Sequence, residues 1–152
     1  MMLFSRPSTY AIRALTYLAM QPPGKLSGTR EISEREDIPN FFLGKVLLQL
    51  RRGRLLRSYK GTGGGYQLAL PPDKINLLMI VRCIAGDELF DTCILEDHEC
   101  GSYRQCALHE SWVAIRDELR AVLERNTLAE LVRARSAEGV KSPATDSRPA
   151  EQ

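Results

Sequence analysis

A glycine-rich stretch between two strand-like segments limits the folds that this chain can adopt. Residues 61–65 read G-T-G-G-G and join L-L-R-S-Y-K at 55–60 to G-Y-Q-L-A-L at 65–70. Both flanking segments alternate partly between apolar and polar residues, as half-buried strands do. Glycine supplies the positive φ angles that a tight reversal needs. The pattern therefore predicts a β-hairpin with a flexible tip, ended by the two prolines that follow.

Three helical segments precede this hairpin. Apolar residues recur with helical spacing over residues 8–20, and Ser8 or Thr9 is placed to cap the first turn. Thr29 can cap a second, short helix that ends near Asp37, and a third helix is expected over residues 39–52. Three helices followed by a hairpin is the order of a winged helix-turn-helix, whose second turn helix enters the major groove of DNA. The predicted fold class is mainly α with a small β-hairpin.

The third segment, residues 39–52, would be the helix that reads DNA. Its buried face is expected to carry Phe42, Val46, Leu47 and Leu50. On its other face, Asn40 and Gln49 can hydrogen-bond base edges, and Phe41 can contact a thymine methyl group. The helix is expected to close at the glycine that follows it.

Charge is divided unevenly along the chain. The net charge is +2, but residues 1–70 hold 11 Lys and Arg against 4 Asp and Glu, a net of +7, and residues 71–152 hold 10 against 15, a net of −5. A basic run is often only a solvated helix face, but beside a helix-turn-helix it indicates a polyanionic partner. The residues expected to contact double-stranded DNA are Asn40, Phe41, Lys45, Gln49, Arg51, Arg57, Lys60, Thr62, Gly63, Gly64 and Tyr66.

Beyond the hairpin, helices are expected on both sides of a polar loop. Asn76 can cap a helix that stops at Gly86, and a long helix is expected over residues 108–125. A short helix is expected over 126–133, with Asn126 or Thr127 as its cap. The residues from Ser136 onward have little to bury, so we expect disorder there. The chain divides into a winged helix-turn-helix domain over 1–72, a segment with the loop and long helix over 73–135, and a tail over 136–152.

Three of the four cysteines lie in the polar loop, with the spacing C-x6-C-x5-C. No leader or membrane-spanning run is recognised, so we expect a cytoplasmic protein, in which disulfides are disfavoured. Polar neighbours make burial of these three thiols costly, whereas Cys83 lies in an apolar segment and is expected in the core. Metal coordination is favoured over redox-active thiols. Zinc accepts three cysteines and a histidine, while the wide gaps also suit an iron–sulfur cluster.

Several motifs together resemble one family. They are Y-A-I-R-A-L-T-Y-L-A at 10–19, E-I-S-E-R-E-D-I-P at 31–39, K-G-T-G-G-G-Y-Q-L-A at 60–69, N-T-L-A-E-L-V at 126–132 and the spaced cysteines. With them, the chain resembles the Rrf2 family of bacterial transcription regulators. The resemblance implies a homodimer in which the long helix packs against its partner. It also implies an iron–sulfur cluster that alters DNA affinity in response to iron, redox state or nitric oxide. The helix-turn-helix pair of such a dimer would bind a palindromic operator.

The resemblance also assigns the cluster ligands by position. They are Cys93, Cys100, Cys106 and His109. The histidine matches the residue that completes a [2Fe–2S] site in the cluster-assembly regulators, so [2Fe–2S] is expected in preference to [4Fe–4S]. The first cysteine gap is one residue longer than in those regulators, and Thr9 stands where the nitric-oxide-sensing branch has an aspartate. His98 is a spare candidate ligand. An enzyme is not expected, because no C-x-x-C pair is present in the sequence.

Overall fold

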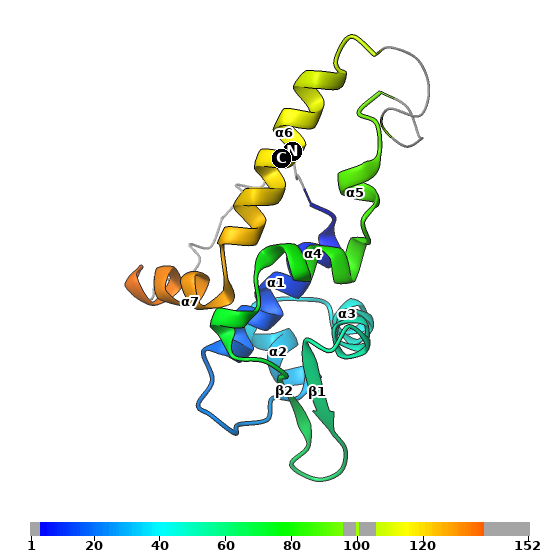
Figure 1. The fold of residues 1–152 in the computed structure, drawn as a ribbon. Coiled ribbons are helices and arrows are strands. Elements are labelled where there is room, and N and C mark those ends of the chain that lie inside the picture. Colours follow the sequence, from blue (N-terminus) through cyan, green and yellow to red (C-terminus); the bar gives the residue numbers. More distant parts are fainter. Residues whose placement is uncertain (1–3, 96–99, 101–105, 139–152) are drawn as a thin grey trace, which may run out of the picture.

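The computed structural model describes residues 4–95, 100 and 106–138. The elements in chain order are α1 (Arg6–Ala19), α2 (Thr29–Glu36), α3 (Asn40–Arg52), β1 (Leu56–Tyr59), β2 (Gly65–Leu68), the 3-10 helix η1 (Pro72–Lys74), α4 (Leu77–Ala85), α5 (Glu88–Asp91), α6 (His109–Arg125) and α7 (Leu128–Ala137). The predicted architecture, mainly helical with one hairpin, is confirmed (Figure 1). No helix within the described residues is long and apolar enough to cross a membrane.

The first helix starts earlier than the sequence pattern predicted. Its N-cap is Ser5, whose side chain accepts a hydrogen bond from the backbone N–H of Ser8, and a proline occupies the first turn. The predicted caps were therefore wrong. Ser8 is 1% exposed and lies inside the helix, while the Thr9 hydroxyl donates back to the carbonyl of Ser5. Proline is favoured at a helix start because its missing N–H would have no partner there.

One hydrophobic core joins the helix-turn-helix to the later helices. α1 lies at its centre and contacts α2, α3, β2, α4 and α7. The buried side chains include Leu15 from α1, Ile32 from α2 and Leu47 from α3. Ile80 from α4 and Leu128 from α7 complete the same cluster. The segments 1–72 and 73–135 therefore share their main core, and burial of this apolar surface is the chief force that holds them together.

α2 and α3 form the turn pair of the helix-turn-helix. The N-cap of α2 is Gly28, so the prediction that Thr29 caps this helix is wrong. Its C-cap, Asp37, adopts a left-handed conformation with φ of 50°, and the Ser33 hydroxyl donates to the carbonyl of Ile38 at 2.6 Å. Ile38 itself is buried. These contacts close α2 within its last turn and direct the chain into α3, so the connection between the two helices is short.

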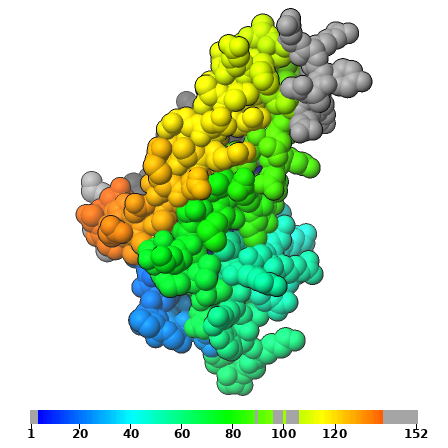
Figure 2. Space-filling model, viewed as in Figure 1, coloured from blue at the N-terminus to red at the C-terminus, as the bar shows by residue number. Residues whose placement is uncertain are grey.

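The hairpin is a two-stranded antiparallel sheet. Leu56 pairs with Leu68, and Tyr59 pairs with Gly65 at the end nearest the tip. A backbone bridge also ties it to the loop after α1, because Ser27 donates to the carbonyl of Tyr66 at 3.1 Å and accepts from its N–H at 2.8 Å. The space-filling view shows the hairpin projecting from one end of the molecule (Figure 2).

The caps predicted for two later helices are confirmed. The side chain of Asn76 accepts from the N–H of Met79 at 2.9 Å, and Thr127 forms a capping box with Glu130 at the start of α7. α6 begins at His109, one residue later than predicted. α7 runs to Ala137, so the prediction that disorder begins at residue 136 is wrong for the first two residues. Residues 139–152 of the predicted tail lie outside the described residues.

A second, smaller core holds α5 between α4 and α6. The sequence analysis did not predict α5, a single turn inside the segment that was expected to be loop. Its Phe90 is fully buried beside Leu78, Val81 and Leu123. α6 extends from this cluster away from the hairpin, so the start of α6 and the hairpin lie at opposite ends of the molecule (Figure 1).

Candidate nucleic-acid interface and thiolate site

α3 presents one apolar face to the core and one polar face to solvent. Its buried residues are Leu43, Val46, Leu47 and Leu50. Every α3 residue that was expected to contact DNA is exposed: Asn40, Phe41, Lys45, Gln49 and Arg51. The Phe41 ring is 69% exposed, and the ammonium group of Lys45 lies 4.3 Å from its centroid. That distance permits a cation–π contact, which holds the two side chains together on the outer face.

The prediction that Phe42 lies in the core is wrong. Its ring is 52% exposed and meets the Phe41 ring edge to face, with 5.7 Å between the centroids. Leu43 takes the buried position instead, and the stripe continues at helical spacing through Val46. The error is one residue, which turns a side chain by about 100° around a helix of 3.6 residues per turn. Two aromatic rings therefore stand exposed at the start of α3.

The hairpin carries the other residues expected at the interface. Arg57, Lys60, Thr62 and Gly63 are exposed, and Gly61 and Gly63 adopt positive φ angles of 93° and 76° at the tip. Gly64 is half-buried. Tyr66 is also half-buried: its ring packs against the main core, and its backbone is paired with the loop after α1. The wing is thus anchored at its base and open at its tip.

Arginines line the junction between α3 and the wing. Arg51 donates from Nη1 to the Ser58 hydroxyl at 3.1 Å, which links the end of α3 to β1. Arg52, Arg54 and Arg57 are exposed, and Arg54 adopts a left-handed conformation with φ of 60°. The sequence of α3 contains no acidic residue. Such a surface attracts phosphate groups from a long range, which gives affinity without sequence reading.

The structure brings two of the four predicted metal ligands into contact. The sulfur of Cys100 lies 3.3 Å from Nδ1 of His109, the first residue of α6. Cys93 follows α5 and Cys106 precedes α6, and both are half-buried. The part of the chain that is described holds no group of three or more His, Cys, Asp or Glu side chains arranged around a metal position. His98, the spare candidate, lies outside the described residues.

The contact between Cys100 and His109 is compatible with joint ligation of one metal. Donor atoms at 2.0–2.3 Å from a tetrahedral ion lie about 3.5 Å apart, close to the observed 3.3 Å. Thiolate and imidazole are donors that zinc and iron–sulfur clusters both accept. The donor types of Cys100 and His109 therefore fit either kind of metal group.

Three contacts connect α5, Cys100 and α6. The indole N–H of Trp112 on α6 donates to the carbonyl of Thr92 at 3.1 Å, next to Cys93. The N–H of Cys100 donates to the carbonyl of Asp91 at 2.9 Å. Arg120 contacts the carboxylate of Asp91 at 3.8 Å. The start of α6, the end of α5 and Cys100 thus form one connected unit.

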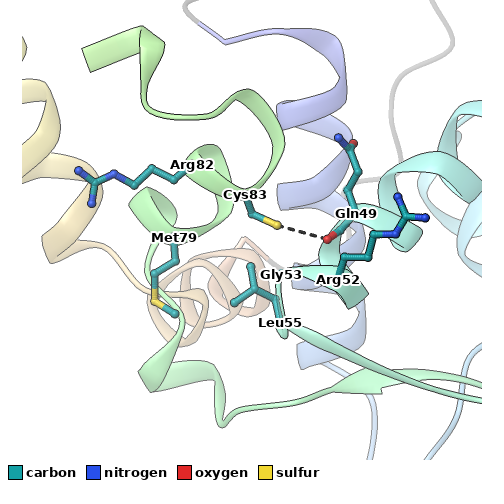
Figure 3. Close-up of a pocket in the computed structure, with 7 residues that line it drawn as sticks. All are labelled: Gln49, Arg52, Gly53, Leu55, Met79, Arg82 and Cys83. Carbon is teal, nitrogen blue, oxygen red and sulfur yellow. Dashed lines mark hydrogen bonds between the residues drawn. The ribbon is translucent and has the colours of Figure 1, made fainter. Parts of the chain in front are cut away.

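A further contact joins α4 to α3. Cys83 on α4 donates from its thiol to the carbonyl of Gln49 on α3 at 3.5 Å, in a pocket of about 630 Å³ (Figure 3). Arg52 and Arg82 lie on opposite sides of this pocket. A side chain on Gly53 would overlap the Cys83 sulfur, so the two helices approach closely here. Burial raises the pKa of the Cys83 thiol, as expected for a cysteine that packs against the core.

Sequence reasoning did not find these anchoring contacts. Trp112 and Thr92 are 20 residues apart, and Cys83 and Gln49 are 34 apart. The indole N–H of a buried tryptophan needs a hydrogen-bond acceptor. This requirement was the one signal in the sequence that Trp112 would bind a group outside its own helix.

A turn pair with a basic outer helix, followed by a hairpin anchored beside it, defines a winged-helix DNA-binding regulator. The Rrf2 family, described as an iron-dependent transcriptional regulator, matches residues 4–134. The chain belongs to the Rrf2 family of DNA-binding transcriptional regulators.

Relatives and solved structures agree with this assignment. A protein of Mycobacterium tuberculosis named as a putative HTH-type transcriptional regulator is 35% identical over 151 residues, which cover 97% of this chain and 91% of that protein. The HTH-type transcriptional regulator IscR of Aliivibrio salmonicida is 30% identical over 124 residues, covering 81% and 73%. The structure of CymR, the global cysteine regulator of B. subtilis, matches with a TM-score of 0.75 and 25% identity, covering 88% of this chain and 98% of that one.

Proposed function

We propose that this protein is a homodimeric transcription regulator whose affinity for a palindromic operator is set by an iron–sulfur cluster. The observation that carries the proposal is the contact between Cys100 and His109 at the start of α6. These two residues of the assigned ligand set are nine positions apart in sequence, yet their donor atoms are close enough to bind one metal ion. Hydrogen bonds to α5 and α6 connect them with the rest of the fold. We place the protein in the cytoplasm, where thiols stay reduced.

The cluster would be held by Cys93, Cys100, Cys106 and His109, and [2Fe–2S] is favoured over [4Fe–4S]. When bound, the cluster supplies a group whose redox state or loss reports on iron, oxidants or nitric oxide. Metal ligation orders a site that need not be preformed, so the two cysteines beyond the contacting pair would join it on binding. His109 also lies at the helix terminus, so its position and the direction of α6 are coupled.

A chain of packed contacts connects this segment with α3. Phe90 on α5 is fully buried between α4 and α6, and the guanidinium carbons of Arg82 and Arg120 lie 5.9 and 5.5 Å from its ring centroid. α4 then contacts α3 through Cys83 and Gln49. Binding of a cluster by Cys93, Cys100 and Cys106 would favour one position of α5 and α4. Because α4 contacts α3, the position of α3 would change with them. A cluster acts on DNA affinity only if its affinity differs between two such settings.

α6 has an apolar surface that suits a second copy of the chain. Leu108, Ile115 and Val122 are 45%, 60% and 37% exposed. Large exposed apolar side chains along one helix favour association. The family resemblance likewise implies a dimer through this helix. Two reading helices in a symmetric dimer would contact half-sites about 34–36 Å apart, which is one turn of DNA.

The test begins with full-length protein purified without oxygen. Iron and acid-labile sulfide are counted per chain, and absorption and Mössbauer spectra define the cluster type. A Cys100→Ser variant and a His109→Ala variant are expected to lose iron. DNA affinity is then compared with and without the cluster by fluorescence anisotropy. A colourless protein that contains zinc would defeat the cluster proposal, and equal affinity in both states would defeat the switch.

A structural zinc ion is the second candidate. Three cysteines and one histidine form a donor set that zinc accepts, and the contact of Cys100 with His109 suits it equally well. A regulator of this kind would lose stability when the metal is removed, but its DNA affinity would not respond to oxidants. Redox-active cysteines without a metal are a third possibility, and the same metal analysis separates it from the other two.

A further inference from the structure

The outer face of α3 contains a glycine that its own fold does not require. Apart from its chain neighbours and the backbone of its own helix, an alanine Cβ at Gly44 would meet no atom within 4 Å, and the residue lies inside the helix. Glycine is less stable than alanine within a helix because it loses more conformational freedom on folding. Neither packing nor backbone conformation within the described residues offsets this loss. The space above Gly44 is therefore available to something outside the chain.

Two exposed apolar side chains border this space. Phe41 and Leu48 stand three residues before and four residues after Gly44, so all three lie on neighbouring positions of the helix surface. Phe41 is 69% exposed and Leu48 is 36% exposed. The missing side chain at Gly44 leaves open space on the helix surface between these two side chains, which we call the notch. A methyl group from outside the chain can approach the helix backbone there.

The charge around the notch indicates what occupies it. Lys45 lies beside Phe41, the arginines of the wing junction follow, and residues 1–70 carry 11 basic against 4 acidic side chains. Such a basic surface favours binding of a polyanion such as DNA. In the major groove of DNA the exposed apolar group is the 5-methyl of thymine, and Asn40 beside the notch can pair with an adenine edge.

We propose that Phe41, Gly44 and Leu48 form a notch on α3 that receives the 5-methyl group of a thymine, so that this chain selects a T·A pair at one position of each half-site. The proposal rests on the proposed function in one respect, namely that α3 is the helix that enters the major groove. It assigns Gly44 and Leu48 to recognition, and it explains why a helix interior keeps a glycine there.

The test uses full-length protein purified without oxygen and a pool of random-sequence duplex DNA. Enriched sites are sequenced, and each thymine is then replaced in turn by deoxyuridine, which lacks only the 5-methyl group. Affinities are measured by fluorescence anisotropy at one salt concentration. One thymine in each half-site is expected to lose about fourfold in affinity on replacement, the effect of one buried methyl group.

Variants then assign the methyl effect to the notch. Gly44→Ala is expected to raise the thermal unfolding midpoint, bind the thymine site more weakly, and lose its discrimination between thymine and deoxyuridine. Leu48→Ala, which opens the notch, is expected to lose the same discrimination. Arg57→Ala is the matched control, since loss of a wing cation should weaken binding to both DNAs equally and keep the fourfold ratio.

The outcomes separate this proposal from the function on which it rests. If specific sites are enriched but no thymine replacement changes affinity, the notch proposal fails and α3 remains a DNA reader. The notch proposal also fails if Gly44→Ala and Leu48→Ala both keep the full deoxyuridine effect. If no sequence is enriched and binding does not depend on salt, the proposed DNA-reading function fails, and the notch fails with it.

Discussion

The guanidinium of Arg135 on α7 donates a hydrogen bond of 2.7 Å to the carboxylate of Glu36 on α2. Glu36 is only 5% exposed, and its second cationic neighbour, Arg13, lies 3.8 Å away. The pair joins the turn pair of the DNA-binding unit to the helix that follows α6. A buried carboxylate is costly unless it is paired and hydrogen-bonded, so this contact is needed for stability.

We predict that Arg135→Ala lowers the free energy of unfolding by about 1–2 kcal/mol. The value lies below that of a fully buried pair because Arg135 is half-exposed and Arg13 still faces the carboxylate. Urea denaturation followed by circular dichroism gives the change. The matched control is Arg30→Ala, which removes an exposed pair with Glu34 and should change stability far less than Arg135→Ala does. Equal effects of the two variants would contradict a structural role for the buried pair.

Adjacent residues on α3 are predicted to behave differently on truncation. Leu43→Ala should cost about 2–4 kcal/mol, because Leu43 is fully buried in the main core. Phe42→Ala should change stability by no more than about 0.5 kcal/mol, because its ring is half-exposed and lies outside the buried stripe. Both are measured by thermal and urea unfolding. A larger loss for Phe42→Ala than for Leu43→Ala would mean that the helix is rotated.

The close approach of α3 and α4 predicts a coupled pair. Gly53→Ala is expected to cost about 1–3 kcal/mol, because the added methyl overlaps the sulfur of Cys83. Cys83→Ala removes that sulfur, and its own Cβ would lie 3.5 Å from the new methyl, an ordinary contact distance. The double variant should therefore be more stable than the sum of the single effects by at least about 0.5 kcal/mol. Additive effects, measured by urea unfolding, would contradict the overlap.

Stability at alkaline pH is predicted to depend on Tyr17. Burial, followed by a hydrogen bond of 2.6 Å to Glu31, raises the pKa of Tyr17 from 10.0 to about 12. A pKa that is higher in the folded state adds stability below pH 10, and this contribution is lost as the pH rises through 12. The urea midpoint of the native protein should therefore fall more steeply over this range than that of Tyr17→Phe. Parallel curves would show that Tyr17 has no raised pKa.

DNA binding through the wing is predicted to follow counterion release. Arg57→Ala should weaken binding to all sequences similarly and reduce the slope of log affinity against log salt by about 1. Fluorescence anisotropy over a range of salt concentrations measures the slope. Arg133→Ala on α7 is the control, because this exposed arginine lies on a helix remote from the hairpin (Figure 1). If both variants keep the native slope, Arg57 does not contact phosphate.

Much of the local structure followed from short-range patterns. Helical spacing, the caps at Asn76 and Thr127, and the glycines of the hairpin tip each act within a few residues, so they can be recognised in the chain. The errors arose where the local sequence was compatible with two different structures. F-F-L at the start of α3 offers two apolar stripes one residue apart, and neighbouring helices decide which one is buried. The single turn α5 is too short to produce a periodic pattern.

The sequence by itself determined the order of helices and hairpin, the basic first half and the spacing of the thiols, because these depend on composition and near neighbours. Only the tertiary structure decided that Cys100 meets His109, that Arg135 reaches Glu36 across 99 positions, and that Phe42 faces outward. Such contacts come from the burial of several apolar faces in one core. That packing sets the position of each element relative to the others, and no short segment of the chain encodes it.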